Sequence, residues 1–384
     1  MSAAVRQPVA LDPALIASAV GLAALGTVMV GSASISIADN ATGEPFYYLI
    51  RHLGALAIGC AGLGFAAALP IETWYRSSGL CLLAALLLLA APLVPSIGQT
   101  VNGATRWVAI GPLRFQPSEP ARLLFLIYVA AYCVRHYAEL TTRSLAFWKP
   151  LLLLMLAAAL LLKEPDFGAV VVLTATTFGV LFLGGARLRD VLAALCVAGT
   201  ALAILAVSSA YRLERLLSFL EPFEHAFDSG FQLTQSLIAI GRGDWFGVGL
   251  GESVQKLFYL PEAHTDFVFA VLAEELGLLG STGVIVLFAV LVYRAISIGQ
   301  RSIAAGLPFH GLLAMGIGIT LGLQAFINIG VNTGLLPTKG LTLPLLSYGR
   351  SSTITTLVAL GLLFRVHHEL APAEMRRAGK RNAE

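Results

Sequence analysis

The sequence predicts an all-α membrane protein, a polytopic bundle of ten transmembrane helices. Of its 384 residues, 57% are hydrophobic and only 12% are charged, whereas water-soluble proteins carry charges on about a quarter of their residues. Apolar segments of about 20 residues, the length that crosses a hydrocarbon core, recur along the whole chain. This composition excludes a soluble enzyme, and residues 1–384 are expected to form a single integral membrane domain.

Ten apolar segments define the expected spans. They are Ala14–Ile35, Leu53–Leu69, Leu80–Ile97, Pro117–Val134, Trp148–Leu162, Gly168–Gly184, Val191–Ala210, Phe267–Ile298, Leu307–Gly330 and Leu345–Val366. An even number of spans puts both termini on one side of the membrane. Short tails are expected at about 1–13 and 367–384, and one long loop at about 211–265 separates the seventh span from the eighth.

The basic residues predict the orientation of these spans. Most Lys and Arg residues of the short loops fall on the side of the termini, and cytoplasmic loops carry the excess of positive charge. The termini are therefore expected in the cytoplasm and loop 211–265 outside it. Basic residues are scattered between apolar runs, so no nucleic-acid partner is expected. The chain also lacks the Walker, Rossmann, HExxH and GxSxG signatures.

Polar residues that could carry chemistry concentrate on the predicted outer face. Asp266 lies where the long loop meets the eighth span, a position that raises the cost of desolvating a carboxylate; capping of the helix N-terminus is the alternative. Glu119 and Arg122 share one helix face, and a cation within a span is a functional candidate by default. Further candidates on this face are Asp166, Gln235, His264, Lys339, Ser347 and Arg350.

These residues predict an outward-facing polar site for a lipid-linked anionic substrate, and both an enzyme and a transporter fit that description. Glu274 and Glu275 lie about two turns into the eighth span. For Glu274 the favoured interpretation is a buried hydrogen-bonding partner for a neighbouring helix.

Longer motifs narrow the choice. They are RLLSFLEPF, GFQLTQSLIAIGRGDWFGVGLG, LPEAHTDFVFAVLAEELG, GATRWVAIGPLRFQPSEPARL, EPDFGAVVVL and QAFINIGVNTGLLPTKGLTLPLLSYG. Across essentially all ten predicted helices, the chain resembles the SEDS family of peptidoglycan polymerases. The segments SVQKLFYLPEAHTDF and GLLPTKGLTLPLLSYG look like the cell-division branch of that family. The elongation branch is the alternative.

The resemblance implies an inverting glycosyltransferase in the bacterial cytoplasmic (inner) membrane, enriched at the division septum. It would polymerise lipid II, the undecaprenyl-pyrophosphoryl disaccharide peptide, beside a class B penicillin-binding protein and other division proteins. Asp266 matches the family's catalytic aspartate. A divalent cation, Mg²⁺ or Mn²⁺, is a candidate for stabilising the pyrophosphate, and no organic cofactor is expected. A flippase that moves lipid II across the membrane is the competing function.

This chain departs from the family pattern at charged positions. Arg122 stands where the family usually has lysine, and we expect it to pair with Asp266 or Glu119; arginine holds its proton, so it cannot shuttle one. Glu164 replaces a usual glutamine and is expected to add negative charge near the site. Arg350 replaces a glycine and either contacts the pyrophosphate or extends to the membrane interface.

Overall fold

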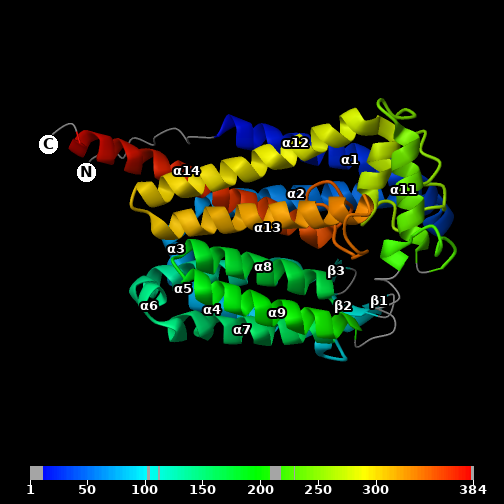
Figure 1. The fold of residues 1–384 in the computed structure, drawn as a ribbon. Helices are drawn as coiled ribbons and strands as arrows, with labels where there is room; N and C mark the ends of the chain where they lie inside the picture. The colour runs from blue at the N-terminus through cyan, green and yellow to red at the C-terminus, as the bar shows by residue number, and fades with distance from the viewer. Residues whose placement is uncertain (1–11, 102–103, 111–112, 208–217, 229, 382–384) are drawn as a thin grey trace.

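Long helices running side by side form the body of the protein in a computed structural model (Figure 1). The structure describes residues 12–101, 104–110, 113–207, 218–228 and 230–381. Most of the predicted tail 1–13, the end of the seventh predicted span and residues 211–217 of the predicted long loop lie outside these ranges. The prediction of a mostly helical protein is confirmed.

The elements follow one another along the chain. The first half contains α1 (Pro13–Thr42), α2 (Tyr47–Ala68), α3 (Ile71–Arg76), α4 (Ser78–Ala90), β1 (Gly98–Val101), β2 (Ala104–Ile110), β3 (Leu113–Phe115), α5 (Ser118–Arg135), α6 (Tyr137–Thr142), α7 (Ser144–Lys163) and α8 (Phe167–Leu183). The second half contains α9 (Leu188–Val207), α11 (Phe231–Gly243), α12 (Val268–Ala304), α13 (Pro308–Asn332) and α14 (Arg350–Arg381).

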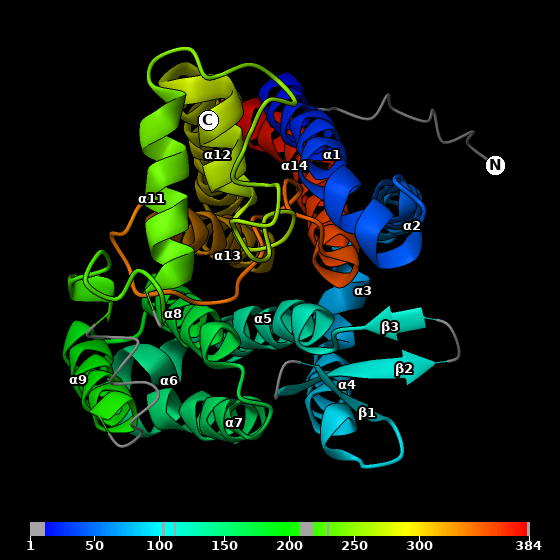
Figure 2. The ribbon, with the colours of Figure 1, turned by 90° about the vertical axis from the view of Figure 1, so that its right-hand side faces the viewer.

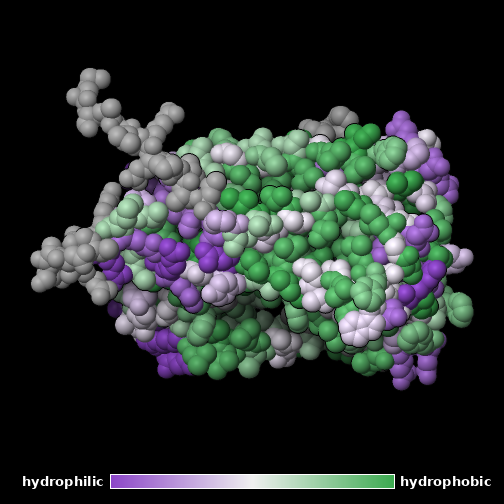
Figure 3. All heavy atoms as spheres, turned by 90° about the horizontal axis from the view of Figure 1, so that it is seen from above, coloured by the Kyte–Doolittle hydropathy of each residue, from purple (hydrophilic) through white to green (hydrophobic). Residues whose placement is uncertain are grey.

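The surface of the bundle is that of an integral membrane protein. Within the described residues, six helices are long and apolar enough to cross a bilayer, namely α1, α2, α7, α12, α13 and α14 up to Met375. Two shorter apolar helical segments, Ser78–Leu93 and Phe167–Leu183, accompany them. Figure 3 shows hydrophobic residues over the middle of the molecule and hydrophilic residues gathered toward its two ends.

Several helices of the bundle pack against each other in pairs. α14 packs along α2, α12 along α13, and α4 along α5 (Figures 1 and 2). Small residues permit the closest of these approaches: a Cβ on Gly59 of α2 would lie 2.4 Å from Leu357, and one on Gly361 of α14 would lie 2.4 Å from the Leu63 carbonyl. α1 begins and α14 ends at the end of the bundle opposite the strands and α11 (Figure 1).

A small antiparallel sheet adds to the predicted all-α fold. The strands pair in the order β1-β2-β3 and lie between α4 and α5 in the chain. The sequence ATRWVAI of β2 is rich in β-branched and aromatic residues, which favour strands. Hydropathy alone gave no signal for this sheet because its segments are short and partly polar.

The eighth predicted span, Phe267–Ile298, is not one continuous helix. α12 is broken at Gly277, whose φ of 66° and ψ of −162° are not helical. The chain from Asp244 to Gly249 fills the break. The Val248 N–H donates to the Glu274 carbonyl at 2.9 Å, and the Leu278 N–H donates to the Asp244 carbonyl at 2.9 Å. Protein groups therefore satisfy the backbone that the break leaves open, as burial in a membrane protein requires.

The tenth predicted span also begins in the wrong place. The structure forms a turn from Leu345, whose φ is 63°, and the helix begins only at Arg350. α14 then continues to Arg381 through the segment predicted as a tail. Because α14 starts later than predicted, Arg350, Ser351 and Ser352 are the first residues of a long helix.

Replacing Gly277 with alanine should destabilise the protein. A side chain in this backbone conformation costs about 1–3 kcal/mol, and the added Cβ would lie 2.4 Å from the Gly247 nitrogen. We expect Gly277→Ala to lower the melting temperature of the detergent-solubilised protein by several degrees. Gly283→Ala is the matched control, because open space surrounds Gly283 on the same helix and alanine favours helix. Equal melting temperatures for wild type and Gly277→Ala would contradict the claim that the break leaves no room for a side chain at position 277.

Candidate functional site

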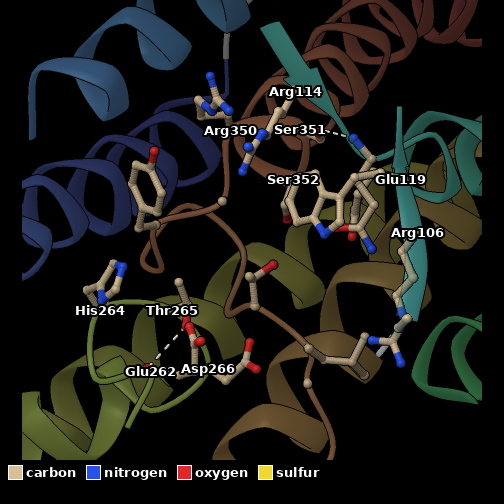
Figure 4. Close-up of a pocket in the computed structure, with 18 of the residues that line it drawn as sticks. Arg106, Arg114, Glu119, Glu262, His264, Thr265, Asp266, Arg350, Ser351 and Ser352 are labelled. Atoms are coloured by element: carbon tan, nitrogen blue, oxygen red, sulfur yellow. Dashed lines mark hydrogen bonds between the residues drawn. The ribbon is translucent and has the colours of Figure 1, made fainter. Parts of the chain in front are cut away.

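A cavity of about 850 Å³ opens at the end of the bundle that carries the sheet. Its walls come from the start of α2, the strands, the starts of α5, α8 and α11, the turn before α12 and the segment 338–352 before and into α14. Six predicted site residues line it: Glu119, Asp166, His264, Asp266, Lys339 and Arg350. Elements far apart in the sequence thus meet at one polar site (Figure 4).

Asp266 occupies the turn that leads into α12. Two buried asparagines of α13 hold its backbone carbonyl: Asn328 Nδ2 donates to it at 2.8 Å and Asn332 Nδ2 at 3.0 Å. Asn332 Oδ1 also accepts from the Ala270 N–H at 3.1 Å, inside the first turn of α12. These contacts fix the start of α12 and leave the carboxylate of Asp266 in the cavity. Neither asparagine was singled out from the sequence.

The segment before α14 closes on Asp266 from the other side. Asn328 Nδ2 also donates to the Leu341 carbonyl at 2.6 Å, so one amide links this segment to the Asp266 turn. A Cβ built on Gly340 would lie 3.0 Å from Asp266 Oδ2. Glycine at this position therefore permits the backbone to approach the carboxylate closely.

The surroundings of Asp266 favour its protonated form. Loss of solvation in the cavity raises the pKa of Asp266 to about 7, and the negative charge of Glu262 adds to the rise. The Arg106 guanidinium opposes this effect, and Asp166 reinforces it more weakly. A carboxylate whose pKa lies near neutral pH is suited to general base catalysis. α12 begins at Val268, and its N-cap residue is Phe267. Asp266 therefore does not cap this helix, which was its alternative role.

Asp166 has a partly structural role. Its Oδ1 accepts from the Ala169 N–H at 3.1 Å and caps α8, whereas its Oδ2 lies 3.3 Å from Gln116 Nε2 and 3.4 Å from Ser118 Oγ. The cap holds the side chain at the wall of the cavity. Lys339 also lines this region, with its Nζ 4.4 Å from the centre of the Phe167 ring.

Two arginine side chains face Asp266 from across the cavity. Arg114 and Arg350 lie together on the side of the cavity opposite Glu262 and Asp266 (Figure 4). Arg51 also lines the cavity and stacks over the Tyr47 ring at 4.2 Å. The N-terminus of α14 carries Arg350 and adds the positive end of a helix dipole. This side of the cavity can therefore stabilise a phosphate group. Arg51 and Arg114 were not among the residues selected from the sequence.

Three predicted site residues are absent from the cavity lining: Arg122, Gln235 and Ser347. Arg122 is buried behind Glu119 and pairs with it at 2.5 Å, one of the two partners predicted. Gln232, one turn earlier on α11, lines the cavity where Gln235 was expected. Ser347 accepts from the Leu343 N–H at 2.8 Å and so stabilises the turn before α14.

Glu274 and Glu275 fasten the long loop to α12. Glu274 is fully buried and accepts hydrogen bonds from Arg242, Ser253 and the backbone N–H of Val254. The Glu275 carboxylate pairs with Lys256 at 2.7 Å. Glu274 is thus a buried hydrogen-bonding partner of a neighbouring helix, as predicted, through Arg242 of α11, and it also binds the loop at Ser253 and Val254.

Glu164 lies in the turn between α7 and α8, two residues before Asp166 of the cavity wall. It is fully buried, and neither carboxyl oxygen has a hydrogen-bond partner among the described atoms. Burial raises the pKa of Glu164 to about 8, and the charge of Asp166 adds to the rise. Arg106 donates to the backbone carbonyls of Glu164 and Pro165. Burial therefore disfavours the ionised form of Glu164, which runs against the expectation that this residue adds negative charge near the site.

A cage made wholly of protein ligands is not found for a metal ion. In the part of the chain that the structure describes, no group of three His, Cys, Asp or Glu side chains could hold one. Mg²⁺ is usually held by one or two carboxylates together with substrate phosphates. A requirement for Mg²⁺ or Mn²⁺ therefore stays a prediction.

Comparison with known proteins assigns the chain to a family. Residues 13–371 match the model of the cell cycle protein family FtsW/RodA/SpoVE. The chain belongs to this family. It is 54% identical over 360 residues to "Probable peptidoglycan glycosyltransferase FtsW" of Alkalilimnicola ehrlichii, covering 94% of this chain and 90% of that protein. It is 52% identical to the protein of the same name from Thioalkalivibrio sulfidiphilus, covering 98% and 94%.

Solved structures share the fold. A chain in a structure described as "Structural coordination of polymerization and crosslinking by a peptidoglycan synthase complex" matches with a TM-score of 0.77 and 31% identity, covering 94% of this chain and 99% of that chain. The crystal structure of the rod shape determining protein RodA of Thermus thermophilus matches with a TM-score of 0.70 and 31% identity, covering 94% and 97%.

Glu164→Gln should stabilise the protein increasingly as the pH rises. The unfolded chain ionises Glu164 above its ordinary pKa of 4.5, whereas the folded protein resists ionisation up to about pH 8. Wild type therefore loses stability between these pH values, and glutamine does not. We expect the melting temperature of Glu164→Gln to exceed that of wild type by about 5 °C or more at pH 8, with a smaller difference at pH 5.

The exposed Glu72→Gln is the control for loss of a carboxyl group elsewhere. The difference in melting temperature between Glu72→Gln and wild type should not grow as the pH rises. A difference between Glu164→Gln and wild type that stays constant from pH 5 to pH 8 would mean that Glu164 ionises normally.

Proposed function

We propose that this protein is a peptidoglycan glycosyltransferase that polymerises lipid II into glycan strands at the outer face of the cytoplasmic membrane. The names of its relatives support the activity. The observation that carries the mechanism is Asp266, a partly desolvated carboxylate placed across a polar cavity from Arg114 and Arg350. A base opposite a cationic surface fits a reaction that removes a proton at one end and releases pyrophosphate at the other.

The reaction joins two lipid-linked sugars. The 4-hydroxyl of the acceptor N-acetylglucosamine attacks the anomeric carbon of the donor N-acetylmuramic acid, and Asp266 takes the hydroxyl proton. A bond forms between the acceptor oxygen and the anomeric carbon while the bond to the phosphate oxygen breaks. Undecaprenyl pyrophosphate leaves with the electron pair. Attack opposite to the leaving group inverts the anomeric configuration.

The cations stabilise charge where it develops. Arg114, Arg350 and the N-terminus of α14 would bind the departing pyrophosphate. Arg51 lines the same cavity and adds a further positive charge. Pyrophosphate is a good leaving group, so the second carboxylic acid that glycosidases use to protonate theirs is unnecessary. Asp166, Glu119 and Lys339 would complete the polar wall that orients the sugars.

The wider organisation belongs to the same proposal. The protein would form a single integral domain of ten spans in the inner membrane, with cytoplasmic tails and the 211–265 segment outside. The bundle end with the sheet and α11 would then face outward. A class B penicillin-binding protein would crosslink the strands, and the match to a chain of a peptidoglycan synthase complex supports such a partner. The identity to FtsW proteins supports work at the division septum with other division proteins.

Removing the carboxylate of Asp266 should abolish strand formation. General base catalysis contributes about 100- to 10,000-fold to a rate, so we expect Asp266→Ala to lower the rate of polymerisation by at least about 100-fold. The assay measures glycan strands made from labelled lipid II by the purified protein with its penicillin-binding partner, with penicillin present to block crosslinking. The control is Asp39→Ala, which removes an exposed aspartate outside the cavity.

Strands of equal length and amount from Asp266→Ala would remove this residue from the mechanism. No strands from wild type, together with movement of lipid II across vesicle membranes, would favour the flippase instead.

A further inference from the structure

Three rings form a continuous wall of the cavity. Tyr48 of α2, His264 of the turn before α12 and Tyr348 of the turn before α14 all line it. Their ring centres lie 4.6 Å apart for Tyr48 and His264, 5.1 Å for Tyr48 and Tyr348, and 5.6 Å for His264 and Tyr348. We call these three residues the aromatic wall. None of these three side chains takes part in the proton transfer or the pyrophosphate binding proposed for the reaction.

The aromatic wall connects the two charged regions of the cavity. His264 is two residues before Asp266, and Tyr348 is two residues before Arg350. The Tyr348 N–H donates to the His264 carbonyl at 2.9 Å, which joins the two turns directly. A molecule lying against the wall would thus have the carboxylate near one end and the cationic group near the other.

The chemistry of the aromatic wall differs from that of the rest of the cavity. Tyr48 and Tyr348 are only half-buried, so part of each ring is accessible. His264 is buried, and its Nδ1 has no hydrogen-bond partner within the described structure. Burial lowers the pKa of His264 and so disfavours the charged imidazolium, although the charge of Glu262 opposes this shift. The wall therefore offers uncharged ring surface together with one unused ring nitrogen.

A pyranose ring matches this surface. One face of a sugar ring presents C–H groups, which are attracted weakly to the negative face of an aromatic ring. The hydroxyl and amide groups at its edge can hydrogen bond to an imidazole nitrogen or a phenol. Phosphate, in contrast, needs the cations at Arg114 and Arg350. The aromatic wall and the cationic region thus suit the two chemically different parts of one sugar phosphate.

We propose that the aromatic wall binds the pyranose ring of the donor sugar of lipid II. The proposal rests on the polymerase function proposed above and deepens it. The donor carries its phosphate on the anomeric carbon, so binding of the phosphate near Arg350 places the ring between Arg350 and Asp266. The wall spans that interval through Tyr348 and His264. It would then hold the anomeric carbon facing the acceptor hydroxyl whose proton Asp266 accepts.

The test compares variants that keep the ring with variants that lose it. Initial rates of strand formation are measured against lipid II concentration, with the penicillin-binding partner and penicillin present. We expect Tyr48→Leu and Tyr348→Leu each to raise KM about tenfold, the loss of one aromatic contact of about 1.4 kcal/mol. Tyr48→Phe and Tyr348→Phe keep the ring and should stay within about twofold of wild type. Tyr293→Leu, which removes an exposed ring on α12, is the control and should leave KM unchanged.

The melting temperature of each variant is also measured, which distinguishes a loss of binding from a loss of folding. The two positions are tested independently, so that one unstable variant leaves the other informative. Folded leucine variants with the wild-type KM would overturn the sugar subsite while leaving the polymerase intact. Phenylalanine variants as impaired as the leucine variants would also overturn it, since the hydroxyl and not the ring would then matter. A wild-type protein that makes no strands would overturn the polymerase function and the subsite with it.

Discussion

The hydrogen bonds from Asn328 and Asn332 to the carbonyl of Asp266 are the contact on which the site depends. They attach the turn before α12 to α13, and Asn328 also holds Leu341 in the segment leading to α14. Three separate parts of the chain thus have fixed positions around one carboxylate. Buried amides are expensive to leave unpaired, so these bonds resist displacement. Gly340 completes the arrangement because its lack of a side chain leaves room for Asp266.

The same packing gives the carboxylate its reactivity. Burial and the neighbouring charge of Glu262 make ionisation of Asp266 harder, and its pKa rises toward neutrality. A loop free in water would leave such a carboxylate solvated, whereas the loop here is fastened to α12 by Glu274 and Glu275 and inserted into the break of that helix. Fold and chemistry are therefore linked: the interactions that close the end of the membrane bundle also produce the base.

Much of this organisation could be predicted from the sequence. The apolar segments indicated the helices, because crossing a bilayer demands long uncharged runs. Motifs around Asp266 indicated the principal site residue. The break at Gly277 could not be seen in the same way, since hydropathy averages over a window and does not report backbone conformation. The pair of Arg122 and Glu119, three residues apart on α5, was one of the two pairings expected from the sequence. The raised pKa of Glu164, in contrast, depends on burial by segments that are distant in the sequence and that no local pattern specifies.

The central claim is that Asp266 acts as a base whose pKa is raised by its surroundings. The most direct test is the pH dependence of kcat/KM for strand formation, which reports the pKa values of the protein before it binds lipid II. Because the base works only when ionised, kcat/KM should rise about tenfold per pH unit below the pKa of Asp266 and level off above about pH 7. A kcat/KM that is constant from pH 5.5 to pH 8.5 would contradict the claim, because a carboxylate with an ordinary pKa is already ionised throughout that range.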